Sequence, residues 1–320
     1  MTQESGLAPL RVVQVAKVAQ GGGAERIASS LHRGLLARGH GSWMATSRRV
    51  PDDPTMLTIP KGRRGRRSPL HRAWRRVERW ADEQAARRGR EVFDFPGTRR
   101  IPDLPPDPPD LLHLHNLHGR YFDLRQLAPL SGRLPVVMTL HDEWTFTGHC
   151  AYALYGDRWR TGCGSCPDLG VYPAIPADAT RANLRAKASI YRGSRLYVST
   201  PSRWLMDEAR QSVLAPGVAA WRVIPNGVDR TVFAPGDRAT ARMALGIPAE
   251  PFVLLFAANR GRSNPFKDWD TVAEAAERAA AIVTERPVLC IALGDDGPAR
   301  EFANGELRFV PYRTVLAQIA

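Results

Sequence analysis

The chain has 320 residues, of which 43% are hydrophobic, and a formal net charge of +13. This length suggests about two domains, and four cysteines are too few for a disulfide scaffold. No apolar run approaches the roughly 20 residues that span a bilayer, and the first ten residues lack the layout of a signal peptide. We therefore expect a cytoplasmic protein.

Short strand-like runs alternate with helical patterns along the chain. Residues 11–16 (RVVQVA) predict a buried strand, and the apolar spacing over 25–38 predicts the helix that follows. Further strands are expected over 42–46, 111–115, 135–140, 196–200, 221–224, 252–257 and 287–293, and helices over 177–191 and 270–283. This alternation predicts an α/β fold with parallel sheets and helices on both faces. A stretch of Ala, Pro and Gly near 214–220 separates an N-terminal domain, 1–213, from a C-terminal domain, 214–320.

Residues 61–90 carry most of the excess charge, with twelve Lys or Arg and three acids. One helical stripe within them is apolar: Leu70, Trp74, Val77 and Ala81. A basic amphipathic helix with a tryptophan is typical of a surface that binds anionic membranes. A helix that packs Trp74 on the first domain and exposes its arginines to water would have the same pattern. Nucleic acid is not expected as a partner, because no base-stacking or groove-reading motif accompanies the charge.

Three glycines separate the first expected strand from the first helix. At Gly22 and Gly23 the backbone N–H groups can approach a phosphate, and the following helix N-terminus favours an anion. A tight strand-to-helix turn would use the same residues, so the pattern alone leaves both interpretations open. A dinucleotide fingerprint would need another glycine near Arg26 and an acid after the second strand, and both are missing. An NAD-dependent dehydrogenase is therefore disfavoured.

Polar side chains gather where two neighbouring strands are expected to end. His115, Asn116 and His118 follow one strand, and His141 and Asp142 follow the next. Ligands of open α/β sheets bind at the carboxyl ends of the strands. These residues are therefore site candidates, with the pair His141 and Asp142 the better supported one.

Three of the four cysteines are clustered in a C-x(12)-C-x(2)-C layout, Cys150, Cys163 and Cys166, and His149 precedes them. Three thiolates and an imidazole are a ligand set that a structural zinc ion accepts. Reduced cysteines in a packed loop would give the same pattern. Both interpretations stay open.

Taken in order, the motifs resemble those of family 4 retaining glycosyltransferases, especially the bacterial branch that builds exopolysaccharide and capsule. The resemblance rests on GGGAER at 21–26, the block from 110 to 167 with LHLHNLHGRYF and LHDEWTFTGHCAY, TPSRW at 200–204, IPNGVD at 224–229 and NPFKD at 264–268. Each motif is modest, but their joint order over nearly the whole chain is specific.

This resemblance implies the GT-B architecture, in which two Rossmann-like domains with parallel sheets face a cleft. A nucleotide-sugar donor would bind mainly to the second domain, and a glycan or lipid-linked acceptor mainly to the first. Transfer would retain the anomeric configuration and require no metal, so that cations and helix N-termini stabilise the departing diphosphate. A nucleotide-sugar epimerase of the same fold is the alternative enzyme. The resemblance also fits a peripheral location at the inner face of the membrane.

Donor-side roles follow from the matched motifs. Lys267 matches the family lysine that meets the diphosphate, and spacing makes Arg262 its partner, with Arg260 as the alternative. Gly22 and Gly23 would approach the same diphosphate from the first domain.

The remaining roles are assigned in the same way. Asn226 is placed with the donor-binding residues. His141 resembles the histidine near the reacting sugar, and with Arg262 and Lys267 it completes the candidate catalytic set. The acceptor side is assigned to His115, Asn116, His118 and Asp142.

Relatives continue after the FVPY stretch at 309–312 with a helix, further strands and a loop that carries two glutamates. This chain ends at residue 320, inside a helix expected over 315–320. We therefore expect an incomplete second domain and poor catalysis, and an inactive sugar-nucleotide-binding fragment is a further alternative. The identity of the sugar, the nucleotide base and the acceptor stays open at this stage.

Overall fold

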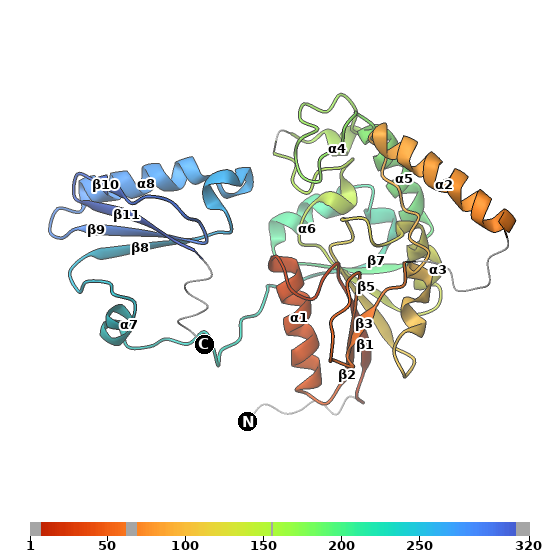
Figure 1. Cartoon of the computed structure of the whole chain (residues 1–320), viewed down its shortest axis with the longest axis horizontal. Coiled ribbons are helices and arrows are strands. Elements are labelled where there is room, and N and C mark those ends of the chain that lie inside the picture. Colours follow the sequence, from red (N-terminus) through yellow and green to blue (C-terminus); the bar gives the residue numbers. More distant parts are fainter. Residues whose placement is uncertain (1–7, 62–68, 155, 312–320) are drawn as a thin grey trace. The chain divides into compact units, whose positions relative to one another are not determined.

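The computed structural model describes residues 8–61, 69–154 and 156–311. The chain divides into two compact units, Met1–Gly227 and Val228–Ala320 (Figure 1). Each unit contains a sheet flanked by helices, which confirms the predicted α/β class. The side chains of Leu70 and Trp74 and the helix expected over 315–320 lie outside the described residues.

The first unit is built on a seven-stranded parallel sheet with the order β3-β2-β1-β4-β5-β6-β7. Its strands are β1 (Arg11–Val15), β2 (Gly41–Thr46), β3 (Met56–Thr58), β4 (Leu111–His115), β5 (Val136–Thr139), β6 (Leu196–Thr200) and β7 (Val218–Val223). Side chains of the central strands, such as Val13, Leu112 and Val136, are fully buried. Burial on both faces explains why these strands appear in the sequence as continuous apolar runs.

The α-helices of this unit are α1 (Gly23–Leu36), α2 (Pro69–Arg87), α3 (Leu127–Ser131), α4 (Arg158–Thr161), α5 (Thr180–Arg192) and α6 (Arg203–Arg210). Short 3₁₀ helices are η1 (Thr98–Asp103), η2 (Leu124–Gln126), η3 (Trp144–Phe146) and η4 (Ala215–Gly217). Helix α1 packs on β1, β2 and β4, α6 packs on β6 and β7, and α3 packs on β5 and α5.

The segment after α2 is anchored to α5. Gly89 has a φ of +76°, and a Cβ atom built on it would lie 1.8 Å from the carbonyl oxygen of Ala177. The side chain of Asn183 on α5 donates to the Gly89 carbonyl oxygen at 3.0 Å and accepts from the Glu91 N–H at 3.0 Å. Only glycine combines this backbone conformation with so close an approach.

The second unit has a four-stranded sheet with the order β10-β11-β9-β8. Strands β8 (Phe252–Ala257), β9 (Val288–Leu293) and β11 (Gly305–Val310) are parallel, and β10 (Arg300–Phe302) is antiparallel to β11. Its helices are α7 (Arg238–Ala244) and α8 (Trp269–Ile282), and two short 3₁₀ helices, η5 (Gly261–Ser263) and η6 (Pro265–Lys267), precede α8.

One strand lies in a different unit from the one that the sequence suggests. Strand β7 follows the boundary expected at 213/214, yet it pairs with β6 and completes the first sheet. The first compact unit accordingly ends at Gly227. The composition of 214–220 marks the short helix η4 and the entry to β7 rather than a link between sheets.

Candidate functional site

The first sheet has a topological switch point between β1 and β4, because the chain order runs outward from these two strands in opposite directions. Ligands of doubly wound folds bind beside such a point, at the carboxyl ends of the strands. The polar residues expected at two strand ends lie here: His115 ends β4, and His141 follows β5. The fold therefore brings together residues that are 26 positions apart.

Three histidines form a row across the strand ends. Nδ1 of His115 lies 3.0 Å from Nε2 of His141, and Nε2 of His115 lies 2.9 Å from Oε1 of Gln14 on β1. The ring of His113 packs against that of His115, with centroids 4.3 Å apart, and its Nε2 bonds Thr139 at 2.7 Å. Burial lowers the pKa of His113 to about 4, and it lowers the pKa of His115 well below the ordinary value.

His141 is half-buried, and burial lowers its pKa, while the nearby carboxylates of Asp142 and Glu25 act in the opposite direction. Its imidazole is therefore neutral at pH 7. Helix α1, which begins at the glycine turn, packs on β4, the strand that His115 ends.

A second polar pair lies beside this row. Nε2 of His118 is 2.9 Å from Oδ2 of Asp142, and Oδ1 of Asp142 accepts from the N–H of Trp144 at 3.0 Å. The hydroxyl group of Tyr172 lies 3.4 Å from Nδ1 of His118. Both imidazole nitrogens of His118 are thus engaged. The side chain of Asn116 is half-buried, and its backbone oxygen accepts from Tyr121 at 3.0 Å.

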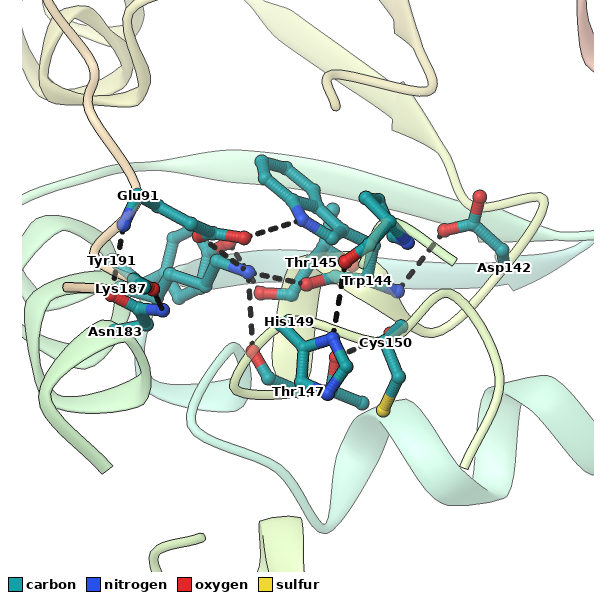
Figure 2. Close-up of polar contacts among 12 residues, drawn as sticks. Glu91, Asp142, Trp144, Thr145, Thr147, His149, Cys150, Asn183, Lys187 and Tyr191 are labelled. Carbon is teal, nitrogen blue, oxygen red and sulfur yellow. Dashed lines mark hydrogen bonds and ion pairs between the residues drawn. The ribbon is translucent and has the colours of Figure 1, made fainter. Parts of the chain in front are cut away.

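The loop that carries Asp142 is held from beneath by a buried ammonium group. Figure 2 shows Lys187 of α5 donating to the backbone oxygens of Trp144, at 2.7 Å, and Thr147, at 3.1 Å. Its Nζ also lies 3.0 Å from Oε2 of Glu91, whose other oxygen accepts from the indole N–H of Trp144 at 2.6 Å. The Lys187 side chain is fully buried. A buried carbonyl oxygen needs a hydrogen-bond donor, and Lys187 supplies one to each of these two.

A pocket opens next to His118. It has a volume of about 210 Å³ and is lined by Glu91, Phe93, Arg120, Trp144 and Ile175 among others. Its walls combine aromatic and apolar groups with charged ones, as small-molecule sites do.

The glycine turn is arranged around an acid. Gly22 caps α1, and Gly23 is its first residue, as the sequence predicts for a strand-to-helix turn. The carboxylate of Glu25 folds back over the turn, with Oε2 3.2 Å from where a Cβ atom on Gly22 would lie. The positive end of the helix dipole is therefore already faced by a negative charge.

In the second unit, the expected donor residues lie on the turn between β8 and α8. The backbone N–H of Arg262 donates to Asp295 at 2.8 Å, its guanidinium lies 3.6 Å from the same carboxylate, and it stacks over Phe309 at 4.5 Å. Arg260 and Lys267 are exposed, and neither forms an ion pair with another residue in the described part of the chain. Asn226 is exposed near the end of the first unit.

The cysteine cluster lines a small cavity of about 50 Å³ together with His149. Nε2 of His149 lies 3.5 Å from Sγ of Cys166, and its Nδ1 bonds the carbonyl oxygen of Pro173 at 3.1 Å. Burial raises the pKa of the Cys150 thiol to about 11. Within residues 8–61, 69–154 and 156–311, no three His, Cys, Asp or Glu side chains are arranged to hold a metal ion. Zinc binding at these residues stays a prediction from the sequence.

Residues Pro69–Arg87 of the basic segment form the long helix α2, as the apolar stripe predicts. Two large apolar side chains on it are exposed, Val77 at 57% and Trp80 at 63%. Among the described residues, no helix combines the length and the apolar character needed to cross a membrane.

Sequence reasoning missed several residues of this region. Gln14 lies inside an apolar strand, and Lys17 lies half-buried against the backbone of Gly119 at the switch point. Lys187 lies in α5, whose sequence is typical of a helix that covers one face of a sheet. Among these residues, only Gln14 could have been found from the sequence, because a polar side chain within a buried apolar strand indicates a specific contact.

Comparisons with known proteins find a matching family and several similar proteins. The model of the family described as Glycosyltransferase Family 4 matches residues 21–232. The putative colanic acid biosynthesis glycosyl transferase WcaC of Escherichia coli (strain K12) is 31% identical over 131 residues, which cover 38% of this chain and 32% of the relative. A D-inositol 3-phosphate glycosyltransferase of Mycobacterium tuberculosis (strain ATCC 25177 / H37Ra) is 34% identical over 127 residues, which cover 39% of this chain and 24% of the relative.

A solved glycosyltransferase from Rickettsia africae aligns with 98% of this chain and 72% of its own length, with a TM-score of 0.48 and 11% identity. The matches to the two curated relatives span about a third or less of their lengths. The family match, in contrast, covers more than half of this chain. The chain therefore belongs to glycosyltransferase family 4.

Proposed function

We propose that this protein transfers a sugar from a nucleotide-sugar donor to a glycan or lipid-linked acceptor, in the biosynthesis of a polysaccharide. The observation that carries the proposal is the cluster of His115, His118, His141 and Asp142 at the switch point of a family 4 chain. The colanic acid biosynthesis relative supports a polysaccharide product.

The departing nucleoside diphosphate needs positive charge, which we assign to the turn before α8. Arg260 and Lys267 have no acidic partner within the described residues, so their charges are available to a ligand. Arg262 contacts Asp295 and orders the turn. A diphosphate would have to displace that carboxylate in order to bind the Arg262 guanidinium. Two cations and the N-terminus of α8 can stabilise the leaving group without a metal.

The acceptor side is assigned to the first unit. The imidazole of His141 is neutral and can bond a hydroxyl group of the transferred sugar or of the acceptor. The pocket beside His118 provides a concave surface for the rest of the acceptor. We propose transfer with retention of the anomeric configuration, in which the donor phosphate takes the proton of the acceptor hydroxyl group.

A role at the membrane is part of the same proposal. A lipid-linked acceptor lies at a membrane surface, and α2 presents exposed Val77 and Trp80 on a helix rich in arginine. Such a helix can bury apolar side chains at the headgroup boundary while its cations face anionic lipids.

The test uses the chain as it stands. UDP-, GDP- and dTDP-sugars are screened for a rise in the melting temperature of the chain. The stabilising donor, labelled in its sugar, is then incubated with the protein and a membrane extract. We expect one nucleotide class to stabilise the protein, and His141→Gln to reduce transfer at least tenfold without abolishing donor binding. His40→Gln, outside the cluster, is the matched control. The proposal fails if no sugar nucleotide stabilises the chain and no label is transferred.

A further inference from the structure

We propose that Gln14 and His115 are positioning residues that fix the neutral tautomer of His141, so that His141 presents Nδ1 as a hydrogen-bond acceptor to a hydroxyl group of the bound sugar. This inference rests on the proposed function for the identity of the ligand. The tautomer itself follows from two contacts in the first unit, Gln14 with His115 and His115 with His141.

The first contact sets the direction of the chain of hydrogen bonds. Oε1 of Gln14 lies 2.9 Å from Nε2 of His115, and both side chains are buried, with 1% and 0% of their surface exposed. A carbonyl oxygen only accepts hydrogen bonds. With the Gln14 carbonyl oxygen in this place, Nε2 of His115 carries the proton.

The second contact passes this constraint to His141. Burial keeps His115 neutral by lowering its pKa, so its Nδ1 has no proton and can only accept. Nε2 of His141 lies 3.0 Å from this nitrogen. The contact is a hydrogen bond only if Nε2 of His141 donates.

The consequence concerns the other nitrogen of His141. The ring is neutral, so Nδ1 carries a lone pair, and within the described residues no hydrogen bond is formed at this nitrogen. The complementary ligand group is a donor, which a sugar hydroxyl group is and a diphosphate oxygen is not. The candidate-site imidazoles are those of His115, His118 and His141. His115 and His118 have both nitrogens engaged. His141 alone among these three has a nitrogen left for a ligand.

The orientation of the Gln14 amide decides between two ligand chemistries. With the carbonyl oxygen toward His115, His141 accepts from a hydroxyl group. With the NH₂ group in that place, every proton in the chain would shift by one position, and His141 would donate from Nδ1 to a phosphate oxygen. A residue two strands away from His141 thus selects the partner of its ring.

The experiment measures proton positions in the ligand-free full chain by ¹⁵N NMR of histidine-labelled protein, with the His141 signals assigned by their loss in His141→Gln. We expect His115 and His141 to be protonated at Nε2. Gln14→Met removes the acceptor at similar length, and we expect His141 to become a mixture of both tautomers. Thr139→Val is the matched control: it removes the partner of His113 and should leave the tautomer of His141 unchanged.

Two results would overturn the inference: His141 protonated at Nδ1 in the wild-type chain, or an unchanged tautomer in Gln14→Met. If Gln14→Met does not fold, the wild-type spectrum alone decides the direction of the proton chain. The measurement needs no donor or acceptor. A wrong tautomer therefore refutes this inference even in an active enzyme, whereas a failed transfer assay refutes the proposed function and not the tautomer.

Discussion

Nζ of Lys187 lies 3.8 Å from the centre of the Trp144 ring and 2.7 Å from the backbone oxygen of the same residue. One buried ammonium group thus fixes both the ring and the main chain of Trp144. The N–H of Trp144 in turn bonds Asp142, which holds His118. The positions of Asp142 and His118 therefore depend on a lysine in the neighbouring helix α5.

Lys187→Met should lower the free energy of unfolding of the first unit by about 3–5 kcal/mol, because it leaves the Glu91 carboxylate buried without its partner. Adding Glu91→Leu should recover part of this loss, since it removes the unpaired charge. Urea unfolding followed by tryptophan fluorescence measures both. Lys61→Met, at an exposed position, is the control and should change stability by less than about 0.5 kcal/mol. A loss of that small size in Lys187→Met would contradict the buried pair.

The stability of the chain should depend on the pH through Glu143. Burial raises the pKa of this carboxyl group to about 7, against the hydrogen bond from the Ala153 N–H, and Glu208 and Asp142 raise it further. The folded state therefore binds the proton more tightly than the unfolded state, whose value is 4.5. The stabilising contribution of Glu143 is complete below pH 4.5 and is lost as the pH rises through about 7.

Glu143→Gln stays neutral at every pH and keeps an oxygen for the Ala153 N–H. As the pH is raised from 5 to 8, the melting temperature of Glu143→Gln should therefore rise relative to that of the wild type. Glu83→Gln, on the exposed side of α2, is the control and should follow the wild type. Parallel curves for wild type and Glu143→Gln would show that Glu143 is ionised throughout.

Lys267→Ala and Arg260→Ala should each weaken the binding of a sugar nucleotide by about tenfold or more, the usual value for a lost charge-assisted hydrogen bond. Arg262→Ala should weaken it less, because Asp295 already engages that guanidinium. Isothermal titration calorimetry with the donor found in the screen gives the dissociation constants. Arg278→Ala, in a surface pair on α8, is the control. Equal affinities in all four variants would remove the turn before α8 from the donor site.

Helix α2 should bind anionic vesicles and not neutral ones, and added salt should weaken this binding. Replacing the exposed pair in Val77→Ser/Trp80→Ser should reduce co-sedimentation with phosphatidylglycerol vesicles while leaving the charge unchanged. Equal sedimentation of wild type and double variant would show that charge alone is responsible. Sedimentation with neither kind of vesicle would show that the helix is only a solvated surface.

The sequence predicts the strands and helices well where burial on both faces leaves apolar runs, as in β1, β4 and β5. It places His115 and His141 at strand ends, because the end of an apolar run is visible in one dimension. It cannot show that Gln14 meets His115, because that contact depends on the strand order. Strand β1 lies next to β4, although 95 residues of chain separate Val15 from Leu111.

Lys187 was missed for a related reason. Its helix reads as a covering helix, and only the packed structure shows that the lysine points into the protein toward Glu91. The division of the chain was hard to place because composition marks short irregular segments, while strand pairing decides to which sheet β7 belongs.

Gly89 gives this protein an unusual pattern of tolerance to mutation. It lies in a turn after a helix, where substitutions are ordinarily harmless, but every side chain would collide with the main chain at Ala177. A survey of random substitutions should therefore find position 89 as intolerant as the central strands, while the neighbouring exposed positions Arg88 and Arg90 accept most residues.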